Sequence, residues 1–85
     1  MAIDVDVSFY GRLADLAGRR RTVSVAPSAT ARYVADALAA TAPAVGEAVR
    51  APGTFVAVGE RIADLDAPLG DARSVSFGSP VSGGR

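Results

Sequence analysis

The chain has 85 residues, of which 49% are hydrophobic, and its 9 basic and 9 acidic residues give a formal net charge of zero. This length is enough for one small domain and too short for a catalytic domain joined to a regulatory one. A net charge of zero argues against electrostatic binding to nucleic acid or to an anionic membrane surface.

The composition also lacks the side chains that many catalytic sites use. The sequence contains no Cys, His or Lys, and all its basic residues are Arg. Thiolate metal sites, disulfides, thiol nucleophiles, imidazole bases and Schiff bases are therefore excluded. Asp64, Asp66 and Asp71 fall in one region, but their spacing matches no calcium loop, and we expect no metal site. We expect a partner or substrate of enzymes that binds no cofactor itself.

The N-terminal region enters a regular pattern at once. No signal peptide is visible and no apolar run approaches the length that spans a membrane, so we expect a cytoplasmic protein. Ile3, Val5, Val7 and Phe9 alternate with polar residues, which predicts a strand over residues 3–10 with one buried face.

The following residues, 11–17, change to a helical period. Leu13, Leu16 and Ala17 are expected to share the apolar face of a short helix, which ends at Gly18. Three consecutive arginines come next. A basic run after a helix is more typical of a solvated turn than of a nucleic-acid patch, particularly at zero net charge.

A second strand is predicted over residues 22–25, and the main helix over residues 30–40, with Ser28 or Thr30 as its N-cap. A further helical turn is expected over residues 43–49, after Pro43. The apolar stripe of the main helix is expected to consist of Val34, Ala37, Leu38 and Thr41.

Three more strands are predicted in the second half of the chain. Residues 54–58 are apolar throughout, which is typical of a strand inside a sheet. A tight turn leads into a short edge strand, residues 61–63, and residues 74–77 alternate once more. Residues 78–85 have no pattern that would bury them, and we expect a flexible tail.

This order of elements predicts an α+β fold of the β-grasp, ubiquitin-like type. We expect a mixed sheet of four to five strands, one main helix across it and a short helix after the first strand. The first and last strands are expected to be parallel neighbours at the centre of the sheet. The predicted domain covers residues 1–77 and the tail covers residues 78–85.

The tail ends in two glycines followed by one arginine. Gly83 and Gly84 present a backbone without side chains, slim enough to enter a narrow channel. The six residues 79–84 extend roughly 20 Å at about 3.3–3.6 Å each. Pro80 restricts Ser79 to extended conformations and stiffens the base of the tail. A carboxylate at such an end needs activation before it reacts, most simply as an acyl-adenylate. A Gly/Ser terminus without function, or a cloning remnant, has the same composition.

Five blocks of the sequence resemble one family when taken together. They are Val7 to Gly18, Val56 to Glu60, Asp64 to Asp71, Val75 to Phe77 and Pro80 to Gly84. In this combination the chain resembles the MoaD/ThiS-type sulfur carriers, which include the small subunit of molybdopterin synthase. The resemblance is weakest over residues 39–53.

The resemblance implies a carrier that is not itself an enzyme. An adenylating enzyme related to ubiquitin activators would use ATP to convert the C-terminal Gly84 to an acyl-adenylate. Sulfur from a cysteine desulfurase or a rhodanese-type donor would then give a thiocarboxylate, which an acceptor synthase would use to make molybdopterin or another sulfur-containing metabolite. The residues that the resemblance places in the active sites of these partners are Gly83, Ser82, Val81 and Pro80.

The sequence departs from the family pattern at two places. Arg85 follows Gly84, so the resemblance implies a precursor that a peptidase, such as a metallopeptidase, must trim. Gly78 and Ser79 stand where the family often has an aromatic residue and a proline, which puts molybdopterin synthase in doubt as the acceptor. Tyr10 and Phe77 are the residues that we expect on the partner-facing surface.

Two other functions remain open at this point. One is a β-grasp binding or adaptor module whose tail does no chemistry. The other is a ubiquitin-like modifier, which could be joined to other proteins although, without Lys, it cannot form Lys-linked chains of itself.

Overall fold

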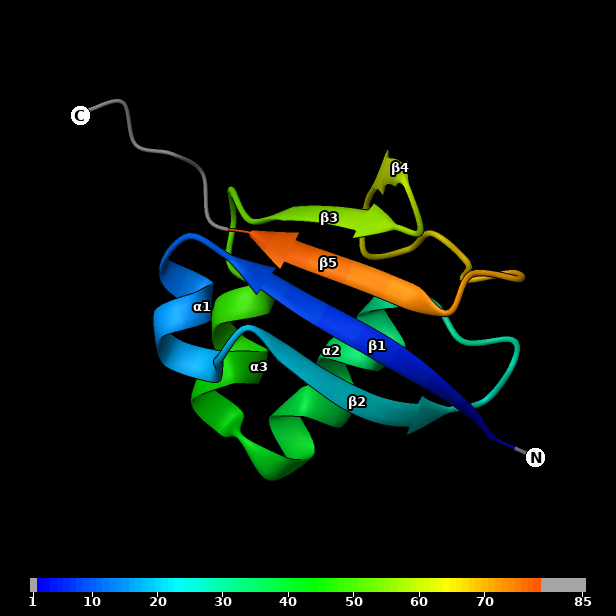
Figure 1. Ribbon diagram of the computed structural model, residues 1–85, viewed down its shortest axis with the longest axis horizontal. Helices are drawn as coiled ribbons and strands as arrows, with labels where there is room; N and C mark the ends of the chain where they lie inside the picture. Colours follow the sequence, from blue (N-terminus) through cyan, green and yellow to red (C-terminus); the bar gives the residue numbers. More distant parts are fainter. Residues whose placement is uncertain (1, 79–85) are drawn as a thin grey trace.

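The computed structural model describes residues 2–78 (Figure 1). Five strands form one sheet, and the helices cover one of its faces. In chain order the elements are β1 (Ile3–Tyr10), α1 (Arg12–Ala17), β2 (Arg20–Val25), α2 (Ala31–Thr41), α3 (Pro43–Val49), β3 (Phe55–Val58), β4 (Arg61–Ala63) and β5 (Ser74–Gly78).

The strand order is β2-β1-β5-β3-β4, so the last strand of the chain lies in the middle of the sheet. β1 pairs antiparallel with β2 and parallel with β5, while β3 pairs antiparallel with both β5 and β4. This mixed sheet is that of a β-grasp fold, and it confirms the predicted fold and the parallel pairing of the first and last strands.

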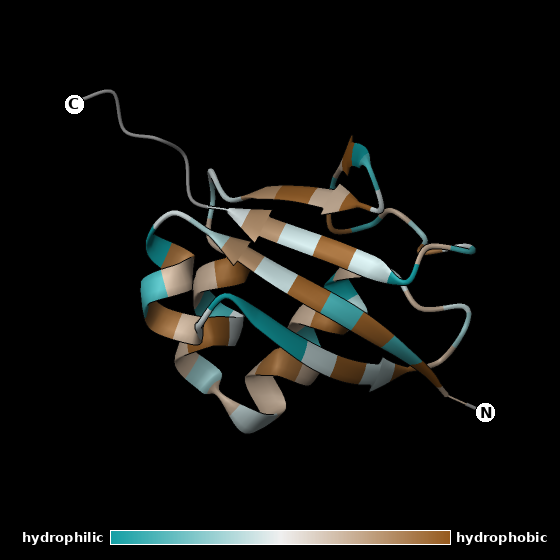
Figure 2. Cartoon of the chain, in the orientation of Figure 1, coloured by the Kyte–Doolittle hydropathy of each residue, from teal (hydrophilic) through white to brown (hydrophobic). Residues whose placement is uncertain are grey.

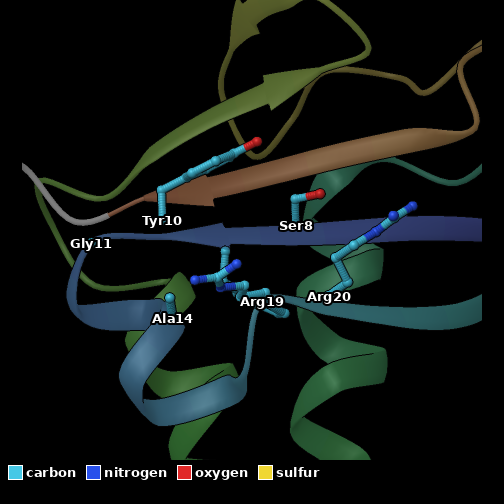
Figure 3. A pocket seen from close by; sticks show the side chains of 7 residues that line it. Ser8, Tyr10, Gly11, Ala14, Arg19 and Arg20 are labelled. Atoms are coloured by element: carbon cyan, nitrogen blue, oxygen red, sulfur yellow. The ribbon is translucent and has the colours of Figure 1, made fainter.

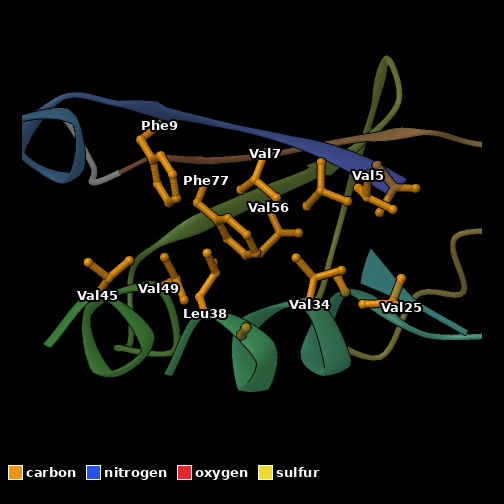
Figure 4. Packing of buried hydrophobic residues seen from close by; sticks show 14 of the residues in the cluster. Val5, Val7, Phe9, Val25, Val34, Leu38, Val45, Val49, Val56 and Phe77 are labelled. Carbon is orange, nitrogen blue, oxygen red and sulfur yellow. The ribbon is translucent and has the colours of Figure 1, made fainter. Parts of the chain in front are cut away.

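One hydrophobic core lies between the sheet and the helices (Figure 4). Alternation along β1 and β5 directs every second side chain into it, and Figure 2 shows the same alternation as bands of colour. The largest side chains that are almost completely buried are Phe77, Leu38, Val5, Val7, Val34, Val49 and Val75. No polar or charged residue among residues 2–78 is buried, so packing rather than internal ion pairs holds the domain together.

The main helix, α2, begins as its sequence predicts. The Thr30 side chain accepts a hydrogen bond from the Tyr33 backbone N–H at 3.4 Å, so Thr30 rather than Ser28 is the N-cap. Val34 and Leu38 are buried as expected, but Thr41 is exposed. The buried face also includes alanines at helical spacing, which allow α2 to lie close to the sheet.

Several predicted boundaries and positions are wrong in detail. Leu16 is 49% exposed because the buried residues of α1 are Leu13 and Ala17, which are four residues apart and share the opposite face. β2 begins at Arg20, so the last two of the three arginines belong to a strand rather than to a turn. β3 has a neighbour on each side as predicted, but its outer face is open, and Phe55 is exposed there.

Two of the three aspartates in the loop between β4 and β5 form interactions that stabilise this region. Asp64 accepts a hydrogen bond from the Asp66 backbone N–H at 2.9 Å, and Asp66 forms an ion pair with Arg32 at 3.0 Å. Among residues 2–78, no three acidic side chains lie close enough together to hold a metal ion. None of the helices in this part of the chain has both the length and the apolar character that crossing a membrane requires.

Candidate functional site

The point at which the C-terminal segment leaves the domain is fixed by β5. This strand ends at Gly78, which pairs with Tyr10 of β1 on one side and with Phe55 of β3 on the other. Gly78 therefore belongs to the folded domain and not to the predicted tail. The predicted reactive and threading residues, Gly84, Gly83, Ser82, Val81 and Pro80, lie outside the described residues, as does Arg85.

An aromatic pair covers this point on the outer face of the sheet. The rings of Tyr10 and Phe55 are stacked, with centroids 6.5 Å apart and an interplanar angle of 21°. The two residues are 53% and 39% exposed. A Cβ atom at Gly78 would overlap the Phe55 ring, so the missing side chain of Gly78 makes room for Phe55. We call Tyr10, Phe55 and Gly78 the tail-root surface.

The other predicted surface residue, Phe77, lies elsewhere. It is fully buried and stacks on Phe9 with ring centroids 6.3 Å apart. The prediction that Phe77 contacts partners is wrong, because the alternation of β5 turns it toward the helices together with Val75. Tyr10 is on the outer face, where contact with a partner is sterically open, and its role there stays a prediction.

Sequence reasoning missed Phe55. It begins an apolar strand, and the apolar run predicts only that this strand lies inside the sheet. The signal that could have found it is the glycine at position 78. A glycine in a strand often marks a place where a neighbouring group approaches closely, and here that group is the Phe55 ring.

A pocket adjoins the tail-root surface on the side of β2 (Figure 3). It has a volume of about 500 Å³ and lies where β1, α1 and the start of β2 meet. Ser8 and Tyr10 of β1 line it together with Arg19 and Arg20, and the Tyr10 side chain points away from the two arginines, across β5 toward β3. No carboxylate lines the pocket. Its chemistry is that of a binding surface with hydrogen-bond donors and positive charge.

The mixed five-stranded sheet with its helices on one face is the β-grasp fold of ubiquitin-like proteins. Residues 7–84 match the ThiS family, and the chain belongs to that family. The match extends through both glycines of the tail.

Two solved structures have the same fold. The chain is similar to the crystal structure of SAMP1 from Haloferax volcanii, with 26% identity, a TM-score of 0.82 and coverage of 96% of this chain and 100% of that one. A second structure, H. volcanii small archaeal modifier protein 1, is 24% identical with a TM-score of 0.78, covering 92% and 98% of the two chains. No curated protein sequence matches the chain significantly.

Together, the family and the fold support the role of a small sulfur carrier or ubiquitin-like modifier. Proteins of this kind are generally not enzymes themselves, and they generally work with activating enzymes related to ubiquitin activators.

Proposed function

We propose that the protein is a sulfur carrier whose Gly84, after removal of Arg85, is adenylated and converted to a thiocarboxylate. The observation that carries the proposal is the ThiS-family match, which continues from the folded domain to Gly84. The fold supports it, because Gly78 is held in the central strand and the six residues 79–84 follow it. Those six residues reach roughly 20 Å when extended, enough to enter an enzyme's active site.

The proposed chemistry has three steps. Hydrolysis of the peptide bond between Gly84 and Arg85, for example by a metallopeptidase, frees the Gly84 carboxylate. An oxygen of that carboxylate attacks the α-phosphorus of ATP on an adenylating enzyme, and pyrophosphate leaves. In the third step, the terminal sulfur of a persulfide on a cysteine desulfurase or a rhodanese-type donor attacks the carbonyl carbon and AMP leaves. A thiol then reduces the resulting acyl disulfide, which frees the thiocarboxylate and leaves a disulfide between that thiol and the donor cysteine. The carrier acts as a cosubstrate throughout, and its own side chains bind partners rather than catalyse.

The acceptor is a synthase that makes a sulfur-containing metabolite. Molybdopterin is one candidate product. Gly78 and Phe55 give this chain a tail-root surface built differently from that of relatives with an aromatic residue at the position of Gly78, so a different acceptor fits as well.

A ubiquitin-like modifier is the second candidate, and the similarity to small archaeal modifier proteins supports it. The activated Gly84 is common to both functions. In a carrier the acyl group is captured by sulfur, whereas in a modifier it is captured by an amine of another protein.

The test is mass spectrometry of chains with three different C-termini. Protein ending at Gly84 is incubated with ATP, the adenylating enzyme of the same organism and sulfide. It is expected to gain the mass difference of one oxygen-to-sulfur exchange. The full chain ending at Arg85 and a chain ending at Gly83 are the matched controls, and both should remain unchanged.

Each other result has a defined meaning. An isopeptide bond to a second protein in cell extract would establish the modifier. Loading of the chain that ends at Gly83 would refute the assignment of Gly84 as the reactive residue. An unchanged mass of the Gly84 chain, while the enzyme adenylates another substrate, would leave only a binding or adaptor module.

A further inference from the structure

The surface near Gly78 carries positive charge without carrying amines. Arg19 directly precedes β2, which begins with Arg20 and Arg21, and the whole chain contains no Lys, Cys or His. A guanidinium group stays protonated at neutral pH and does not act as a nucleophile, whereas a Lys amine or a Cys thiol does. The side chains that most readily capture an activated acyl group are therefore missing from the chain itself.

The contacts of these arginines explain a positive charge but not the choice of Arg over Lys. Arg20 uses one nitrogen to contact Asp6 at 3.5 Å, in an ion pair whose two side chains are 70% and 56% exposed. Arg21 donates through Nε to a backbone carbonyl oxygen of α1 at 3.0 Å. A single ammonium donor would serve in either contact, because neither uses the fork geometry that distinguishes Arg from Lys. By contrast, Arg32 on α2 donates to Asp66 through two nitrogens, at 3.1 and 3.0 Å.

The geometry of the sheet decides which side chains the activated end can reach. Gly78 lies beside the last residue of β1, and Phe9, one residue earlier, donates its backbone N–H to the Arg19 carbonyl oxygen at 3.0 Å. Arg19 is therefore two strand spacings, about 10 Å, from the end of β5. Residues 79–84 extend roughly 20 Å, so the carbonyl carbon of Gly84 can return to this region.

The other end of the sheet is beyond this range. β1 and β5 are parallel, so β1 starts at Ile3, seven residues from Tyr10, which is roughly 23 Å at about 3.3 Å per residue. The α-amine precedes Ile3 in the chain. α2 begins after β2, whose last residue pairs with Ile3, and it lies on the covered face of the sheet (Figure 1). Arg32, in the first turn of α2, is thus at the end of the domain opposite Gly78.

We propose that the arginines near Gly78, in place of lysines, prevent the activated Gly84 from acylating its own chain and so keep the acyl group for an external nucleophile. The proposal rests on the proposed function, in which Gly84 is the activated residue. With Arg19→Lys, the amine nitrogen would attack the Gly84 carbonyl carbon, AMP would leave, and an isopeptide bond would close the chain into a ring. Hydroxyl groups do not replace the amine, because they need a base for this attack and the chain has no imidazole or amine side chain to supply one.

The experiment uses chains that end at Gly84 as aryl thioesters, prepared by intein cleavage with an arenethiol. The thioester supplies an activated acyl group without the adenylating enzyme, so the result does not depend on recognition by that enzyme. Arg19→Lys places an amine near Gly78, and Arg32→Lys places the same amine at the opposite end of the domain. Arg19→Gln removes the guanidinium group without adding an amine. Urea unfolding verifies that each variant is folded.

We expect folded Arg19→Lys to release the arenethiol and form a ring, because a short flexible segment gives the new amine a millimolar effective concentration. At about 10 μM protein, ring closure should exceed linkage between two molecules by about 100-fold. The unsubstituted chain, Arg19→Gln and Arg32→Lys should release the thiol only by hydrolysis. Mass spectrometry separates a ring from a hydrolysed chain by the mass of one water molecule, and peptide mapping locates the new bond.

Unfolding the chains in urea is the geometric control. Loops of about 50 and 65 residues differ little in closure entropy, so unfolded Arg32→Lys and Arg19→Lys should form rings at similar rates. The preference for position 19 is then a property of the folded domain.

Three results would overturn the proposal. They are hydrolysis without ring closure in folded Arg19→Lys, equal ring closure in folded Arg19→Lys and Arg32→Lys, and ring closure of the unsubstituted chain through its own N-terminus. Failure of the proposed function is a separate result, because it is seen as an unchanged mass after incubation with ATP and the adenylating enzyme, which the thioester experiment does not use.

Discussion

Gly78 is the position at which a substitution tests the tail-root surface directly. It is not among the glycines with positive φ, so an alanine can adopt its backbone conformation. The obstacle is the Phe55 ring, which occupies the space of the new Cβ. Phe55 is partly exposed and can turn away, so we expect Gly78→Ala to displace the ring rather than to unfold the protein.

The expected change in unfolding free energy combines the contacts that the displaced ring loses with the stabilisation that alanine brings. The stacked pair of Tyr10 and Phe55 is worth about 0.5–1.5 kcal/mol beyond its buried area. Exposing roughly 40 Å² of ring surface costs about 1 kcal/mol more, at about 25 cal/mol per Å². Replacing Gly by Ala restricts the unfolded chain and returns about 0.4–1 kcal/mol. The net expectation is a loss of about 1 kcal/mol of unfolding free energy.

A double-mutant cycle tests whether the Phe55 ring causes this loss, because without the ring Gly78→Ala should stabilise the protein instead of destabilising it. In a Phe55→Ala background there is no ring to displace, so Gly78→Ala should stabilise the protein by about 0.4–1 kcal/mol. Urea unfolding followed by far-UV circular dichroism measures all four chains. If Gly78→Ala changes stability equally in both backgrounds, the ring contact is not the reason for glycine at this position.

Two further predictions concern the helices and use the same measurement. Gly46→Ala should lower the unfolding free energy by about 1–2 kcal/mol, because the cost of overlap between the new Cβ and Ala39 exceeds the gain in helix propensity of about 1 kcal/mol. A more stable variant would show that α2 and α3 separate easily. Thr30→Ala should lose about 1 kcal/mol with the N-cap bond to Tyr33, and Thr30→Ser should keep most of it; equal losses would mean that the methyl group matters instead.

The fold was predictable because local patterns and chain order agreed at every step. Period-two alternation marked β1 and β5, and a helical period marked α2, so the β-grasp order followed from the sequence. The first and last residues of the individual strands and helices were harder to predict. β2 includes two residues of the arginine run because their backbone pairs with β1, with Arg20 opposite Ser8 and Arg21 opposite Val7. Local sequence propensity does not predict such pairing.

The errors at the site have two different origins. Val75 and Phe77 are two residues apart in a strand and therefore share one face, so the alternation that buries Val75 also excludes Phe77 from the partner-facing surface. The contact of Phe55 with Gly78 could not be predicted from alternation, because the two residues are 23 positions apart in sequence and lie on different strands. It depends on the order of β3 and β5 in the sheet, which only the assembled structure provides.

The same sheet order supports the proposed role of Gly84 as the reactive end. β5 lies between β1 and β3, and its buried Val75 and Phe77 fix it against the helices. Gly78 is therefore anchored from both sides, and only five residues separate this anchor from Gly84. An edge strand would allow the anchor itself to fray, and a reacting group misplaced by about 1 Å loses about 100-fold in rate. Because the last strand lies in the middle of the sheet, the domain itself fixes Gly78. The partner enzyme then has to position only the residues between Gly78 and Gly84.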